Sequence, residues 1–249
     1  MSKEMVSKVP EVSLIFWIIK IAATTLGETG GDAMSMSLGL GYLVSTGIFA
    51  AIFLAFVIVQ MTAKRFHPLL YWATIIATTT VGTTLADFAD RSLGIGYAGG
   101  TSLLLALLMT SLIIWHQSLG TVAVNSVSSP KAEIFYWVTI MFSQTLGTAL
   151  GDWTADSASL GYGGGMIVFA ALLAFIAALY YTTNVSRTLL FWAAFILTRP
   201  LGAVVGDFLD KPLSDGGLAL SRYMASAVLL AFIVGCILAV PQRAAARAH

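Results

Sequence analysis

The sequence predicts an all-α membrane protein with eight transmembrane helices, and three observations support this fold class. Hydrophobic residues make up 58% of the 249-residue chain and charged residues only 10%, with a mean hydropathy of +0.88. Such a chain has too little polar surface to cover a water-soluble globule. Apolar segments long enough to cross a bilayer recur along the chain, and a set of landmark residues repeats four times.

Eight apolar segments have roughly the 20 residues that a helix needs to cross about 30 Å of hydrocarbon. They cover residues 12–32, 42–62, 69–88, 98–117, 132–152, 163–183, 188–208 and 217–240. The N-terminal stretch mixes acids with lysines and lacks a small-residue cleavage site, so we expect the first helix to be retained. We expect one membrane domain over residues 1–249.

Tryptophan spacing reveals four copies of one unit. In each copy a Gly follows the tryptophan by ten residues, an Asp by fifteen and a second Gly by twenty-four. The tryptophans are Trp17, Trp72, Trp137 and Trp192. The copies cover approximately residues 12–66, 67–121, 132–186 and 187–240. Their spacings of 55, 65 and 55 residues indicate a duplicated pair with a longer central linker.

Each copy contains two predicted crossings, so all four copies enter the membrane in the same orientation as parallel helical hairpins. The simplest packing is a pseudo-fourfold or twice-twofold arrangement, with the first helix of each hairpin lining a centre. A tryptophan near one interface would act as an aromatic belt residue. The repeated Asp then lies roughly 22 Å further along the helix axis, at 1.5 Å per residue.

The "W…G…GD…GY" pattern, from Trp17 to about Val240, resembles a bacterial family of uncharacterised integral membrane proteins. Members of that family consist of four tandem two-helix repeats of unknown function, each with a repeated Trp and Gly-Asp. The resemblance implies an integral protein of the bacterial inner membrane. It implies no activity, so a functional hypothesis must come from the polar residues.

The two ends of the predicted bundle differ in charge. The end with both termini carries three acids and nine basic residues, namely Lys3, Lys8, Lys20, Lys64, Arg65, Lys131, Arg187, Arg243 and Arg247. The other end carries nine acids and four basic residues, Arg91, Arg199, Lys211 and Arg222. By the positive-inside rule, both termini face the cytoplasm and the acidic end faces outward. The net charge of +1 gives no reason to expect a nucleic-acid partner.

A polar stripe follows the first helix of each copy, at positions seven, eleven and fifteen after the tryptophan. Residues four apart share one helical face. The stripes are Thr24, Glu28 and Asp32; Thr79, Thr83 and Asp87; Gln144, Thr148 and Asp152; and Arg199, Ala203 and Asp207. If the helix continues, further acids follow one turn later at Asp90, Asp156 and Asp210.

These acids are expected to face the interior of the bundle. A carboxylate at the bilayer centre costs about 2.5–3.5 kcal/mol on insertion scales, so four lipid-facing aspartates would cost on the order of 10 kcal/mol. Inside, water, backbone amides, Arg199, Arg91 or a bound cation can offset their charge. Several converging carboxylates cannot all stay charged without compensation, and either protons or metal ions join them.

Two simpler interpretations compete with a binding site. Each Asp can cap the helix that follows, but this leaves Glu28 and the Thr/Gln stripe unexplained. Arg199 is interpreted as an internal salt-bridge partner of Asp207. The Gly-rich stretches "GLGY", "GIGYAGG" and "GYGGG" follow no strand and are typical of turns or close helix packing, so we expect no nucleotide site.

The donor set favours hard cations. The lone Cys236 and the histidines, which fall at the opposite end from the acids, provide no Zn or Cu site. Carboxylate, hydroxyl and amide oxygens suit Mg, Ca or Mn. An enzyme is not expected, because no nucleophile and base occur together among the acids.

The first hypothesis is therefore an inner-membrane cation transporter or channel for a divalent metal such as Mn or Ca, coupled to protons. Its predicted metal ligands are Glu28, Asp32, Asp87, Asp152 and Asp207. Further predicted pathway residues are Asp90, Asp156, Asp210, Thr24, Thr79, Thr83, Gln144, Thr148 and Arg199. No tightly bound cofactor is expected, and the partners are the lipid bilayer, the metal cation and protons. The alternative is a structural or partner-binding membrane protein whose acids are buried helix-capping clasps.

Overall fold

The computed structural model describes residues 7–245, and within them the chain folds into eight long α-helices. The charged residues Lys3, Glu4 and Arg247, which enter the charge comparison, and the C-terminal His249 lie outside this range. The helices are α1 (Leu14–Asp32), α2 (Tyr42–Thr62), α3 (Pro68–Asp87), α4 (Tyr97–Leu119), α5 (Pro130–Asp152), α6 (Gly161–Thr182), α7 (Arg187–Asp210) and α8 (Arg222–Ala239). The predicted all-helical architecture is confirmed.

Local sequence signals explain many helix ends. Pro68 and Pro130 begin α3 and α5, where their missing N–H groups break no helical hydrogen bond. The side chain of Ser129 accepts a hydrogen bond of 3.2 Å from Ala132 N at the start of α5. Gly41 and Gly96, with φ of 75° and 74°, precede α2 and α4, so these glycines allow the chain to turn sharply.

The inner helices of three repeats end in the same way. A π-helical turn follows the repeated Asp directly, at Ala33–Ser37, Phe88–Ser92 and Trp153–Ser157. Such turns are rare and occur often at functional sites. The fourth repeat differs, because α7 continues to Asp210 and is followed by the 3₁₀ turn Leu213–Asp215.

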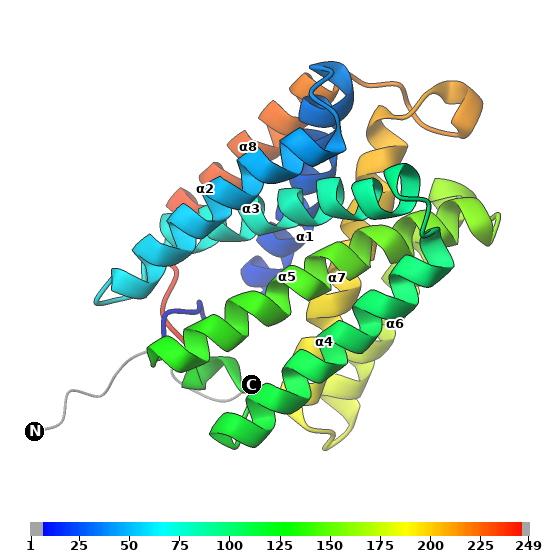
Figure 1. Cartoon of the computed structure of the whole chain (residues 1–249). Coiled ribbons are helices and arrows are strands. Elements are labelled where there is room, and N and C mark those ends of the chain that lie inside the picture. The colour runs from blue at the N-terminus through cyan, green and yellow to red at the C-terminus, as the bar shows by residue number, and fades with distance from the viewer. Residues whose placement is uncertain (1–6, 246–249) are drawn as a thin grey trace, which may run out of the picture.

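The odd-numbered helices form a closed ring of contacts (Figure 1). In this ring α1 packs against α3 and α7, and α5 packs against the same two helices on the other side. Each even-numbered helix covers the ring from outside, with α2 on α3, α4 on α5, α6 on α7 and α8 on α1. The two ends of the described range come together where Pro10 forms an isolated β-bridge with Ala244.

Six helices are long and apolar enough to cross a membrane, namely α2, α3, α4, α6, α7 and α8. In the outer helices among them, only 11–22% of the residues in the candidate membrane-spanning segment are buried inside the protein. In α3 and α7 the buried share is 72% and 67%. The outer helices therefore present an apolar surface suited to lipid. Helices α1 and α5 do not meet this criterion, because polar residues such as Glu28 and Gln144 occupy their ring-facing sides.

The repeated tryptophans form part of an aromatic core, and the prediction of an aromatic belt is wrong for three of them. Trp72, Trp137 and Trp192 are buried, while Trp17 is half-buried. Their rings pack against neighbours from other helices, such as Trp72 against Phe16 with centroids 5.4 Å apart. The end of the ring nearer the termini is therefore filled with aromatic side chains, and the polar residues lie further along the axis.

Candidate functional site

The glycine ten residues after each tryptophan allows neighbouring inner helices to approach closely. At every such position an added Cβ would collide with the residue seven places after the tryptophan of the next repeat. The relationship runs around the ring and closes on itself, because the fourth repeat contacts the first. The pairs are Gly27 with Thr79, Gly82 with Gln144, Gly147 with Arg199, and Gly202 with Thr24. This packing brings all four polar stripes together.

Arg199 crosses the centre of the ring from α7. Its Nη2 donates hydrogen bonds to Glu28 Oε2 at 3.0 Å on α1 and to Thr83 Oγ1 at 2.6 Å on α3, and it also contacts Thr148 on α5. Arg199 is 0% exposed and Glu28 only 2%, so this ion pair is fully inside the protein. Ala203 stands at the position that carries Glu or Thr in the other repeats, so α7 has no polar side chain at that position.

The prediction that Arg199 pairs with Asp207 is wrong. The two residues are eight positions apart on α7, which separates them by roughly 12 Å along the helix at 1.5 Å per residue. Asp207 instead pairs with Lys211, whose Nζ lies 3.1 Å from Asp207 Oδ1. Arg199 thus belongs to a different layer from the aspartates.

The four repeated aspartates form an acid layer one helical turn beyond Glu28. All four are at most 3% exposed, so the expectation that they face the interior is met by their burial. None of the three that precede a π-helical turn uses its side chain to cap that turn. The acid layer consists of Asp32, Asp87, Asp152 and Asp207.

Two basic side chains each join a pair of these aspartates. Arg91 Nε lies 2.9 Å from Asp87 Oδ1 in its own repeat, and Arg91 Nη2 lies 3.4 Å from Asp152 Oδ2 in the next. Lys211 likewise pairs with Asp207 in its own repeat and with Asp32 in the repeat that follows around the ring. The acid layer is therefore divided into two ion-paired halves.

The acids one turn further along have different environments. Asp90 is 8% exposed, and neither of its carboxylate oxygens has a hydrogen-bond partner among residues 7–245. Asp210 pairs with Arg222, with Asp210 Oδ2 at 3.1 Å from Nε. Asp156 lies on the surface, where its Oδ2 accepts a hydrogen bond from the Tyr97 hydroxyl at 3.2 Å. The structure does not bring Asp156 into the acid layer.

The remaining stripe residues lie at the level of Arg199 or between it and the acid layer. Thr24, Thr79, Gln144 and Thr148 are all 0% exposed. Thr24 Oγ1 donates to the backbone oxygen of Thr198 at 3.2 Å. Thr79 Oγ1 and both amide atoms of Gln144 have no hydrogen-bond partner within the described part of the chain. These side chains hold polar atoms inside the ring that remain able to bond water or a ligand.

The sequence analysis did not predict that two lysines are buried inside the protein. Lys20 was assigned to the end with the termini, but it is 0% exposed, with Nζ 4.2 Å from the centroid of the Phe195 ring. Its position four residues before Thr24 continues the polar stripe by one turn, which was a usable signal. Lys211 was counted only among the four basic residues of the acidic end. It stands nineteen residues after Trp192, as Arg91 does after Trp72.

Two groups of carboxylates have the geometry of candidate cation sites. One oxygen from each of Glu28, Asp32 and Asp87 lies within 4.8 Å of the others, and Asp32, Asp207 and Asp210 form a second such group. All five residues are buried. Oxygen ligands at this separation suit Ca²⁺, Mg²⁺ or Mn²⁺. Asp152, the remaining predicted ligand, belongs to neither group and is paired with Arg91.

Fold and site together define an all-helical protein with membrane-like helices, built from four tandem repeats around a buried acidic centre. A family model described as a repeat of unknown function (DUF347) matches residues 15–66, 70–121, 135–186 and 190–240. The chain belongs to this repeat family, which confirms the resemblance seen in the sequence. Neither the curated proteins nor the solved structures yielded a significant match.

Proposed function

We propose that the protein is a transporter for a divalent cation such as Mn²⁺ or Ca²⁺, with Glu28 and the acid layer as its binding site. The observation that carries this proposal is the group formed by Glu28, Asp32 and Asp87, whose oxygens lie within 4.8 Å inside the ring. In this proposal all eight helices cross a bacterial inner membrane with pseudo-fourfold order. Both termini are cytoplasmic, and the acid layer is nearer the outer surface.

The balance of charge supports cation binding. Seven buried carboxylates share this end of the ring with four basic side chains, namely Arg91, Arg199, Lys211 and Arg222. Buried charges require paired partners, so three carboxylates remain to be compensated when all are ionised. A divalent cation together with one proton, or three protons, would supply that compensation. Asp32 Oδ1 is buried and has no hydrogen-bond partner among residues 7–245, so it is available to a ligand.

Lys211, beside the acid layer, gives the proposed site a means of releasing its bound cation. Lys211 Nζ contacts both Asp32 and Asp207, which belong to the two candidate cation groups. A cation that binds Asp32 competes with this ammonium group for the same carboxylate. Departure of the cation lets the ion pair re-form, so Asp32 is not left as an unpaired buried charge. Protonation of neighbouring carboxylates has the same effect, because closely spaced acids titrate as a coupled group.

Arg199 favours a transporter over an open channel. Its guanidinium contacts Glu28, Thr83 and Thr148, so side chains from all four inner helices meet at this level. A fixed positive charge in a narrow passage opposes the entry of cations and protons. Passage of a cation beyond the acid layer therefore requires Arg199 to move, which is expected of alternating access.

Flux into liposomes tests the proposal. Purified protein should carry Mn²⁺ to an encapsulated fluorescent indicator. The Asp32→Asn/Asp87→Asn variant should lose at least tenfold of this flux, because two of three ligands lose their charge. Asp156→Asn is the matched control and should transport like the wild type, since Asp156 lies on the surface. Equal flux from the double variant and the control would refute the acid layer as the transport site.

A structural role is the second candidate, and the arrangement of Arg91 and Lys211 favours it. Each of these residues joins aspartates from two neighbouring repeats, as expected of clasps that hold the ring together. In a purely structural protein, Asp→Asn changes lower the melting temperature while Mn²⁺ leaves it unchanged. In a cation-binding protein, Mn²⁺ raises the melting temperature of the wild type and not that of Asp32→Asn/Asp87→Asn.

A further inference from the structure

The four repeats differ in how their tryptophans are covered. Three of the four inner tryptophans contact an element from the outer layer. Trp137 packs against Phe53 of α2 with centroids 6.3 Å apart, and Trp192 packs against Trp115 of α4 at 5.8 Å. Trp72 Nε1 donates a hydrogen bond of 2.8 Å to Gln242 Oε1 after α8. All three tryptophans are consequently buried.

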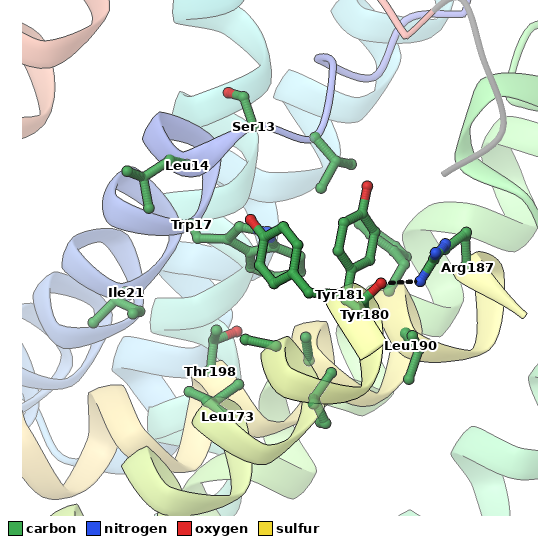
Figure 2. Close-up of a pocket in the computed structure, with 15 residues that line it drawn as sticks. Ser13, Leu14, Trp17, Ile21, Leu173, Tyr180, Tyr181, Arg187, Leu190 and Thr198 are labelled. Atoms are coloured by element: carbon green, nitrogen blue, oxygen red, sulfur yellow. Dashed lines mark hydrogen bonds between the residues drawn. The ribbon is translucent and has the colours of Figure 1, made fainter. Parts of the chain in front are cut away.

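Trp17 lacks this cover and lines a cleft of about 390 Å³ between α1, α6 and α7 (Figure 2). The residue of α6 that would fill the space is Tyr180, which stands 43 residues after its repeat tryptophan, as Trp115 does. Trp115 is 0% exposed, whereas Tyr180 is 39% exposed. The cleft is thus the one place, among these four, where the outer layer leaves a repeat tryptophan open.

The ring of Tyr180 packs against a cation, the Arg187 guanidinium. The Arg187 guanidinium lies 4.3 Å from the centroid of the Tyr180 ring and donates a hydrogen bond to the Tyr180 backbone oxygen. Figure 2 shows Arg187 and Tyr180 on one side of the cleft and Trp17 on the other. Cation–π contact of this kind stabilises the position of the ring. The cleft therefore has a basic group at its edge and a fixed aromatic wall.

The cleft has the chemistry of a lipid site. Its walls are mostly apolar, with side chains such as Leu173, Ile21 and Leu190. The hydroxyl groups of Ser13, Tyr180 and Tyr181 and the Arg187 guanidinium occur toward one end, while Thr198 lies further along α7. That end is where α1 and α7 begin and α6 ends, at the same side as the β-bridge between Pro10 and Ala244. Aromatic and basic residues together are typical of the membrane interface, where lipid head groups lie.

We propose that this cleft binds one anionic phospholipid, with an acyl chain between α1 and α6 and the phosphate near Arg187. An apolar cleft of this size in a bilayer-facing surface matches the dimensions of ordinary ligand pockets. The positive charge at the edge selects an anionic head group over a neutral one. The site is independent of cation transport, because it lies on the outside of the ring and shares no residue with the acid layer.

Native mass spectrometry of the delipidated full chain tests this site. The probes are phosphatidylglycerol and phosphatidylcholine with identical oleoyl chains. The wild type should bind the anionic lipid about fivefold more tightly, which corresponds to about 1 kcal/mol for one basic residue near a phosphate. Arg187→Gln should remove this preference. Arg65→Gln, which removes an exposed charge outside the cleft, should retain it.

A second pair of variants tests the cleft itself. Ala177 lines the cleft and Ala174 does not, although both lie on α6 and are exposed. Ala177→Phe should lower the binding of both lipids at least tenfold, whereas Ala174→Phe should bind like the wild type. Equal binding by these two variants would overturn the proposal. A dimer that only Ala177→Phe dissociates would also overturn it, because a second copy would then be the occupant.

Tryptophan fluorescence provides a readout that leaves Arg187 and Ala177 intact. Phosphatidylglycerol with a dibrominated chain should quench the emission of the wild type, because bromine quenches indoles that it contacts. Trp17→Phe should lose part of this quenching, while the exposed Trp153 still contributes to it. Quenching of the same extent in both proteins would contradict occupation of the cleft by the acyl chain.

Discussion

Arg91 and Lys211 occupy the same position in the second and fourth repeats, and each links the aspartate of its own repeat to that of the next. Their counterparts in the first and third repeats are Met36 and Asp156, neither of which is basic. The basic residues of the polar centre therefore repeat twice around the ring, whereas the helix contacts that form the ring repeat four times. This agrees with the duplicated pair indicated by the spacing of the tryptophans.

The ion pair between Arg199 and Glu28 is expected to be essential for stability. Arg199→Leu leaves Glu28 as an uncompensated buried charge and should cost about 3–5 kcal/mol of the free energy of unfolding. Replacing both residues with Leu should restore part of that loss, since no buried charge remains unpaired. Denaturant titration in detergent measures both effects. A single variant within about 0.5 kcal/mol of the wild type, as expected of the exposed Arg65→Leu control, would contradict this account.

The glycines of the ring are expected to tolerate no side chain. In Gly82→Ala the new Cβ would lie 2.8 Å from the backbone carbon of Gln144 on α5, and the backbone cannot move aside as a flexible side chain does. Overpacking of this kind costs about 1–3 kcal/mol. Gly47→Ala on α2 is the matched control, because nothing lies within 4 Å of its added Cβ.

The two glycine variants should shift the melting temperature in opposite directions. Gly47→Ala should stabilise the protein by up to about 1 kcal/mol through helix propensity. Equal melting temperatures for the two variants would mean that α3 and α5 do not approach each other as described.

Lys211 should make stability depend on pH in the alkaline range. Burial alone would lower the pKa of Lys211, but the carboxylates of Asp207 and Asp32 outweigh it and raise the pKa above its ordinary value. The unfolded chain then releases this proton first, so the contribution is complete below about pH 10 and declines as the pH rises further.

The Lys211→Arg variant isolates this effect. Arginine stays protonated in both states, so between about pH 10 and 12 the wild type should lose stability relative to the variant by up to about 1.4 kcal/mol per pH unit. Thermal melting of both proteins across this range measures the difference. Parallel curves would show that Lys211 is not held between the two aspartates.

Lys211 should also limit the affinity of the acid layer for cations. Lys211→Gln removes the ammonium group that competes for Asp32 and Asp207, so Mn²⁺ should bind this variant more tightly than the wild type, by about tenfold. Lys64→Gln, which removes an exposed charge at the other end, should bind like the wild type. Isothermal titration calorimetry in detergent compares them. Weaker binding by Lys211→Gln would indicate that the lysine orders the site rather than competes for it.

The sequence predicts the helices better than the contacts between them. Hydrophobic length and the repeated tryptophan, Gly and Asp place all eight helices to within a few residues, except that the last begins at Arg222 rather than near residue 217. The burial of the aspartates also follows from the cost of exposing charge to hydrocarbon. These predictions succeed because they depend on properties of one helix at a time.

Contacts across the ring could not be predicted in the same way. Arg199 pairs with Glu28, 171 residues away, because the packing of Gly202 against Thr24 fixes the register of α7 on α1. A single sequence does not state that register. Three of the four repeat tryptophans were wrongly assigned to the membrane interface for a related reason. An aromatic residue near a helix end suits either the interface or a core, and only contacts with neighbouring helices distinguish the two.

The most direct test of the central claim is the anomalous scattering of Mn²⁺ in crystals of the protein. The account predicts a Mn²⁺ peak inside the ring, bounded by the carboxylates of Glu28, Asp32 and Asp87, and no such peak in Asp32→Asn/Asp87→Asn. Peaks confined to surface carboxylates such as Asp156, at Mn²⁺ concentrations that saturate binding in solution, would contradict it.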